Sequence, residues 1–154
     1  MTIAKKISTL CFQLESCMSG NETFLRKVDV IKNEFNLGES STKCIPDPQR
    51  QQLNRVLHST RAFDSGLRLF LEKHGRLDVT LHSIGNYIKV LQNVRTGDRF
   101  RQLNGTDAAN INTLITNERN KYMHAAGQFP TNAQADIIVG KILDYYQRIL
   151  SLEF

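Results

Sequence analysis

The stretch DPQRQQLNRVLHSTRAFDSGLRLFLEKHG, residues 47–75, decides the fold class. Asp47 and Pro48 are typical of a helix start, because an aspartate accepts hydrogen bonds from free amides and proline suits the first turn. Apolar side chains then recur every three or four residues on one side of the segment, namely Leu53, Val56, Leu57, Phe63, Leu67, Phe70 and Leu71. This spacing predicts a long amphipathic helix over about residues 48–74, which Gly75 ends.

The same period continues toward the N-terminus. It predicts helices over about residues 2–18 and 22–36. Gly38 suits the left-handed position that closes a helix, so we expect the second helix to end at Leu37–Gly38. A Ser-, Thr- and Lys-rich loop from Glu39 to Pro46 should then lead into the long helix, and it is too short to separate two domains.

Three further helices are predicted after residue 75. Asp78 is expected to cap one that runs to about residue 93, and Thr106–Asp107 should open the next, which Gly127 stops. Thr131 and Gln134 have the spacing of a capping box for the last one. No strand pattern interrupts the series, so we predict an all-α fold: a single-domain, up-and-down helical bundle of about five to six helices over residues 1–154.

The composition is typical of a single globular domain. A chain of 154 residues with 40% hydrophobic and 23% charged residues can bury a single core without metal or disulfide support. The net charge of +5 is compatible with an anionic partner. No apolar run has the length of a membrane span, no signal-type core follows the N-terminal lysines, and the three cysteines suggest reduced thiols. We therefore expect a cytoplasmic protein without membrane contact.

Two groups of basic residues leave alternatives open. Arg50, Arg55, Arg61, Arg68 and Lys73 fall on the outer face of the long helix, where they form either a solvated charged face or a stripe that follows phosphates. The second group is a loop in which Arg95, Arg99 and Arg101 surround Phe100. Such a loop is either an exposed connector or an RNA contact that uses charge and stacking.

One short patch carries the chemistry that the rest of the chain lacks. In Arg119-Asn120-Lys121-Tyr122-Met123-His124, Asn120 and His124 share a helix face, and the Arg119 side chain is long enough to reach the imidazole. Arginine can bind phosphate through two parallel hydrogen bonds, and the ordinary imidazole of histidine gains or loses its proton near neutral pH. The plain alternative is a solvated helix face with a hydrogen-bonded histidine at its end.

Metal and nucleotide motifs are not recognisable elsewhere. The four histidines (His58, His74, His82 and His124) have no ligand spacing with acidic or cysteine partners, and no Gly-rich phosphate loop exists. We therefore expect neither a metal ion nor another cofactor.

Arg-Asn-x-x-x-His on the penultimate helix of a small helical chain, followed by Gly127, Pro130 and one last helix, resembles the HEPN family (higher eukaryotes and prokaryotes nucleotide-binding domain). Many HEPN proteins are metal-independent ribonucleases that act as toxins or in antiviral defence. The resemblance implies catalytic roles for Arg119, Asn120 and His124. Lys121 beside them and the three loop arginines are candidate RNA contacts because of their positive charge.

The resemblance also implies partners. HEPN ribonucleases generally dimerise with their motif helices facing, which brings two Arg–His patches into one cleft and supplies the second proton-transfer group that one patch lacks. An antitoxin or a larger defence complex is a further expected partner. Toxins neutralised by adenylylation often have a tyrosine two residues after the histidine, whereas Ala126 stands here. Two other functions stay open: a non-catalytic HEPN-like scaffold, and a helical adaptor that binds acidic protein.

Overall fold

The computed structural model describes residues 1–154 and contains only helices as regular structure. Their bounds are α1 Ile3–Cys17, α2 Glu22–Cys44, α3 Pro48–Lys73, α4 Ile84–Gln92, α5 Gly105–Ile111, α6 Asn117–Met123 and α7 Asn132–Leu150. A five-residue π-helical turn, Asn112–Thr116, joins α5 to α6 as one continuous helix. Six continuous helices result, and the prediction of an all-α single-domain bundle is confirmed.

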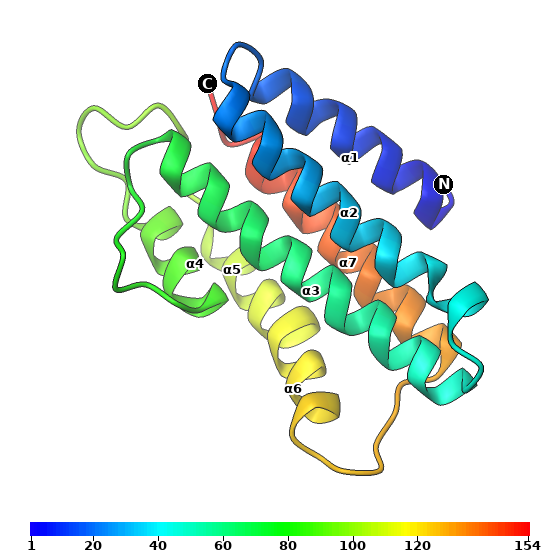
Figure 1. Ribbon diagram of the computed structural model, residues 1–154. Helices are drawn as coiled ribbons and strands as arrows, with labels where there is room; N and C mark the ends of the chain where they lie inside the picture. The colour runs from blue at the N-terminus through cyan, green and yellow to red at the C-terminus, as the bar shows by residue number, and fades with distance from the viewer.

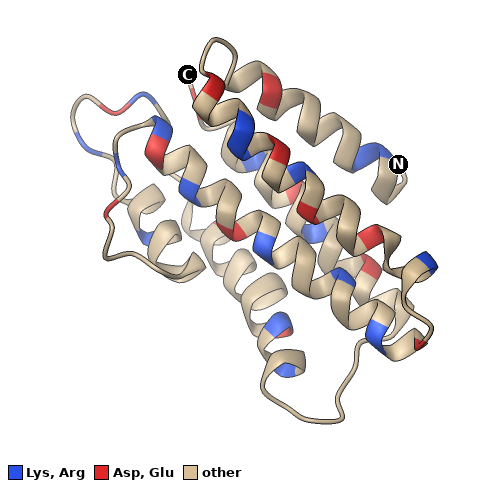
Figure 2. Cartoon of the chain, viewed as in Figure 1, with Lys and Arg blue, Asp and Glu red and all other residues tan.

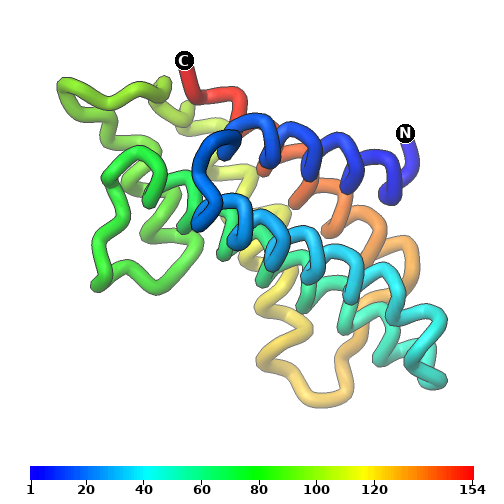
Figure 3. Tube along the Cα trace, turned by 45° about the horizontal axis from the view of Figure 1, so that its top comes forward, coloured from blue at the N-terminus to red at the C-terminus, as the bar shows by residue number.

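Four long helices form the body of the bundle. Consecutive helices α1, α2 and α3 alternate in direction, and α7 lies behind them and contacts both α1 and α3 (Figure 1). One hydrophobic core of 33 buried residues unites the chain. Helix α4 and the continuous helix of α5 and α6 lie to one side of α3, and the end of α6 projects beyond the bundle before the chain returns to α7 (Figure 3).

The predicted end of the second helix at Gly38 is wrong. Helix α2 continues through Gly38 to Cys44, and the expected loop from Glu39 onward is mostly helical. A Cβ on Gly38 would lie 3.2 Å from the Cβ of His58, so this glycine permits close packing of α2 on α3. Glu39 then pairs with Arg55 across the same contact, and this tertiary interaction outweighs the weak helix preference of the serines that follow.

Two other predicted helix starts are displaced. Asp78 does not cap α4; its Oδ1 accepts from the amide of Thr80 at 2.9 Å in a local turn, and the cap of α4 is Ser83, five residues later. Asn104, two residues earlier than predicted, caps α5 by accepting from the amide of Asp107. The capping box at Thr131 and Gln134 is confirmed.

None of the helices is both long and apolar enough to cross a membrane. Basic and acidic residues are interspersed along the visible faces of α2 and α3, and Figure 2 shows no large face of one sign in this view. The modest positive charge is therefore spread out on this side of the bundle.

Candidate functional site: a cleft beside the Arg-Asn-x-x-x-His patch

A cleft of about 590 Å³ opens where α3, the start of α4 and the π-turn with α6 meet. Its walls are Thr60, Arg61, Asp64 and Ser65 from α3, residues 82–85 around the start of α4, and Thr116, Arg119 and Asn120 from the long side helix. Only one of these eleven residues is hydrophobic. The cleft is therefore suited to a polar or charged ligand, and it contains two of the three residues singled out in the motif.

Arg119 has unused hydrogen-bonding capacity at this wall. One terminal nitrogen, Nη1, donates to Oδ1 of Asn120 at 3.3 Å, while Nε is buried and has no partner. A guanidinium has five N–H donors, and a buried donor without an acceptor costs free energy. A ligand with acceptor oxygens, such as a phosphate, would satisfy these donors.

Asp64 brings a carboxyl group to the same cleft. Burial raises the pKa of Asp64, and the nearby positive charges of Arg68 and Arg119 only partly offset that effect. No hydrogen bond contributes to the shift. The site thus combines an under-bonded guanidinium with a carboxyl group whose charged form is disfavoured, a combination more common in functional sites than on ordinary surfaces.

His82 reaches the cleft from the loop before α4. The loop is held on both sides of this residue: Arg68 donates to the carbonyl oxygen of Leu81 at 3.2 Å and to the hydroxyl of buried Tyr87 at 2.7 Å. Immediately after His82, Ser83 accepts from the amide of Asn86 and starts the helix. These contacts fix the backbone of His82 at the cleft wall while its side chain stays exposed.

His124 lies outside the cleft. It is the exposed residue that ends α6, and its amide donates to the carbonyl oxygen of Asn120 at 3.2 Å. Four residues of helix place it about 6 Å further along the axis than Asn120. The structure therefore brings Arg119 and Asn120 into one cleft and leaves His124 about one turn beyond it. The neighbouring Lys121 is exposed and forms a surface ion pair with Glu118 at 2.7 Å.

The loop arginines are elsewhere, and their aromatic neighbour is unavailable. Phe100 is 0% exposed and packs against Phe70, with ring centroids 5.5 Å apart, so it cannot stack on a base. Arg95, Arg99 and Arg101 are exposed, but none of them lines the cleft. The guanidinium of Arg101 lies over the ring of Phe154, 5.7 Å from its centroid, which ties the loop to the C-terminal tail.

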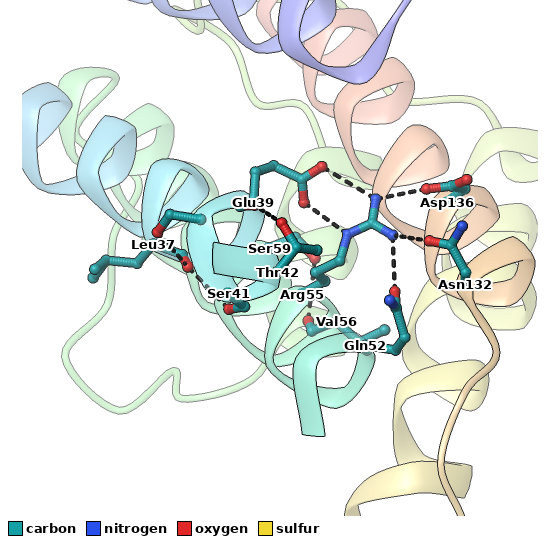
Figure 4. Close-up of polar contacts among 11 residues, drawn as sticks. Leu37, Glu39, Ser41, Thr42, Gln52, Arg55, Val56, Ser59, Asn132 and Asp136 are labelled. Carbon is teal, nitrogen blue, oxygen red and sulfur yellow. Dashed lines mark hydrogen bonds and ion pairs between the residues drawn. The ribbon is translucent and has the colours of Figure 1, made fainter. Parts of the chain in front are cut away.

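Arg55 is not part of a solvated face or a phosphate stripe, because its side chain is only 5% exposed. All its donors are occupied within the protein: Nε and Nη2 bind Glu39, Nη2 also binds Asp136, and Nη1 binds Gln52 and Asn132 (Figure 4). Burial alone would lower the pKa of Arg55, but these carboxylate contacts raise it. Arg55 therefore joins α2, α3 and α7, and its guanidinium has no donor left for a ligand.

Asp64 and His82 are the cleft residues that the sequence did not single out. Asp64 looks like one more charge on the outer face of α3, and His82 stands alone between two predicted helical residues. No spacing rule connects positions 64, 82 and 119, since they meet only through packing. Nowhere in the chain do three His, Cys, Asp or Glu side chains gather as a possible metal site.

Comparisons with protein-family models, curated proteins and solved structures find no match for this chain. The HEPN resemblance consequently rests on the Arg119–His124 motif and its place on the penultimate helix.

Proposed function

We propose that this protein is a metal-independent endoribonuclease of HEPN type. The observation that carries the proposal is the polar cleft in which Arg119 presents a buried, unpartnered Nε beside Asn120. A phosphodiester supplies the acceptor oxygens that this guanidinium lacks, and RNA also brings its own nucleophile, the 2′-hydroxyl.

The proposed reaction needs no protein nucleophile. The 2′-oxygen attacks the adjacent phosphorus, a bond from O2′ to phosphorus forms, and the bond from phosphorus to O5′ breaks. One group takes the proton of the 2′-hydroxyl and another protonates the leaving 5′-oxygen. Arg119 stabilises the charge that develops on the phosphoryl oxygens, Asn120 orients one of the reacting groups, and His124 transfers a proton. The products are a 2′,3′-cyclic phosphate and a 5′-hydroxyl.

A homodimer forms part of the proposal. His124 is exposed and lies about one helical turn outside the cleft of its own chain, on the segment that projects from the bundle. An isologous two-fold contact between motif helices would bring the partner's copy of this histidine to the cleft. In this proposal the protein is a cytoplasmic toxin or defence effector, restrained by an antitoxin or a larger complex, with RNA as its substrate.

The decisive experiment compares purified wild type with His124→Ala on a defined RNA in the presence of EDTA. Wild type should cut and leave 2′,3′-cyclic phosphate ends, and an RNA with 2′-deoxy at the cut site should resist. His124→Ala should be slower by more than roughly 10²-fold, as expected for loss of a general acid or base. Abolition of wild-type cleavage by EDTA, or equal rates for the two proteins, would refute the mechanism. A wild type that binds RNA or a protein but never cuts would instead support the scaffold function.

A further inference from the structure

Cleavage by 2′-hydroxyl attack requires two proton transfers, and the motif of one chain contains a single imidazole. The cleft contains a second one. His82 lines the same cleft as Arg119 and Asn120, although the sequence separates it from Arg119 by 37 positions (119 minus 82). It comes from a different element than the motif, so it approaches a bound phosphate from another side.

We infer that His82 is a second proton-transfer residue of this site, acting at one of the two oxygens while His124 acts at the other. This inference rests on the proposed function. Three observations support it: His82 shares a polar cleft with the phosphate-binding candidate, its backbone is fixed on both sides by Arg68 and Ser83, and its side chain is exposed to a ligand.

The charges around His82 suit this role. The titratable and charged groups on the opposite walls are Arg61 and Asp64 of α3 and Arg119 of α6. His82 forms no ion pair with any of them, whereas His58 is bound to Glu34 and His74 lies near Glu153. Both ring nitrogens of His82 are therefore free to contact a substrate.

The first test is the pH dependence of cleavage by wild type, His82→Ala and His82→Asn. Two proton-transfer groups give wild type a bell-shaped profile. Both variants should cut more slowly by roughly 10²-fold and should lose one limb of the bell, because one of the two groups is gone. His58→Gln, which changes a histidine outside the cleft, is the matched control and should keep both limbs.

A substrate with sulfur in place of the leaving 5′-oxygen assigns the role, since a thiolate departs without a proton. Recovery of the His82→Ala rate on this substrate would make His82 the general acid, and no recovery would make it the general base. If His82 has a purely structural role, the His82 variants should cut more slowly but keep both limbs of the pH profile and respond to the sulfur substrate as wild type does. That result would overturn the inference. So would unchanged cleavage by His82→Ala.

Binding gives a readout that is independent of cleavage. An RNA with 2′-deoxy at the cut site should shift the imidazole NMR signals of His82 in the wild type and much less in Arg119→Ala. Absence of a shift would remove His82 from the RNA site. If wild type cuts no RNA at all, the proposed function itself fails and the catalytic role of His82 fails with it. An active wild type with an equally active His82→Ala variant would overturn the role of His82 alone.

Discussion

Arg119 and Asp64 line one cleft from two different helices, yet no ion pair joins the guanidinium of the first to the carboxylate of the second. The positive charge of Arg119 is close enough to lower the pKa of Asp64, but the effect of burial is larger and the net shift is upward. Opposite charges that are close and unbonded leave space between them for a ligand.

Asp64→Asn should therefore raise the thermal stability at neutral pH. The folded-state pKa of Asp64 is raised, so the fold disfavours its charged form and the carboxylate lowers stability at any pH above that folded value. The advantage of the variant should shrink as pH falls through the raised pKa and should vanish below the ordinary aspartate pKa of 3.8, where the group is protonated in both folded and unfolded chains. Melting temperatures across pH test this, and a variant advantage that grows in acid would contradict it.

Arg119→Lys should slow RNA cleavage by roughly 10²-fold although it keeps the positive charge, because an ammonium group cannot reproduce the planar fork of donors on a phosphate. Single-turnover rates at saturating protein measure this effect without a contribution from binding. The exposed Arg26 on α2 provides the matched control. Equal losses for Arg119→Lys and Arg26→Lys would mean that the guanidinium of Arg119 has no special role.

Arg55→Ala should lower the free energy of unfolding by roughly 2–4 kcal/mol, because it removes a buried cation whose donors join three helices. Arg50→Ala, five residues earlier on α3 at a side chain that is 74% exposed, should change it by less than about 0.5 kcal/mol. Urea unfolding followed by circular dichroism compares the two. RNA cleavage by folded Arg55→Ala should match wild type, since Arg55 has no place in the cleft.

Two glycine-to-alanine changes should have opposite signs. A Cβ on Gly66 would lie 2.2 Å from Cζ of the buried Tyr146 ring, so Gly66→Ala should destabilise the fold by at least about 2 kcal/mol. Nothing lies within 4 Å of a Cβ on Gly140 in α7, and alanine is the better helix former, so Gly140→Ala should stabilise by about 0.5–1 kcal/mol. Thermal melts of both variants check the pair, and equal shifts would contradict this packing of α3 on α7.

Mixing two inactive variants tests whether the site is shared between chains. If His124 acts on the cleft of the partner, a heterodimer of His82→Ala with His124→Ala contains one intact site. Random pairing should then restore about a quarter of wild-type activity. Light scattering should give the mass of a dimer for each protein. A monomer that still cleaves, or a mixture that stays inactive while heterodimers form, would show that each chain works alone.

The number and approximate positions of the helices were predictable from the sequence, because the spacing of apolar residues identifies the buried face of each helix. The positions at which the helices begin and end were harder to predict. Gly38 has the residue type of a helix terminator, but close packing against His58 and the Glu39–Arg55 contact keep the chain helical beyond it. Asp78 has the residue type of a helix cap, but Ser83 takes that role. Both errors arise where a tertiary contact or a competing local turn overrides a local preference.

The candidate site was predictable only along one helix. Arg119 and Asn120 are adjacent in sequence, so a motif can reveal them. Asp64 and His82 join them through the packing of α3, α4 and α6, and no local pattern encodes that meeting. Burial likewise separates Arg55 from the exposed Arg50 and Arg61 on α3, and Phe100 from the arginines beside it. Residue type alone does not distinguish a buried arginine that joins helices from one that binds phosphate.

The π-helical turn at Asn112–Thr116 sets the angular phase of everything that follows it on the same helix. Such a turn is equivalent to one inserted residue, and one residue corresponds to about 100° of rotation. If the same residues formed a regular α-helix throughout, α6 would be rotated by about that angle relative to α5. Arg119 and Asn120 would then turn away from Asp64 and His82 with every side chain still present. Which side chains of this helix face the cleft is thus determined by the turn upstream of them as much as by the motif itself.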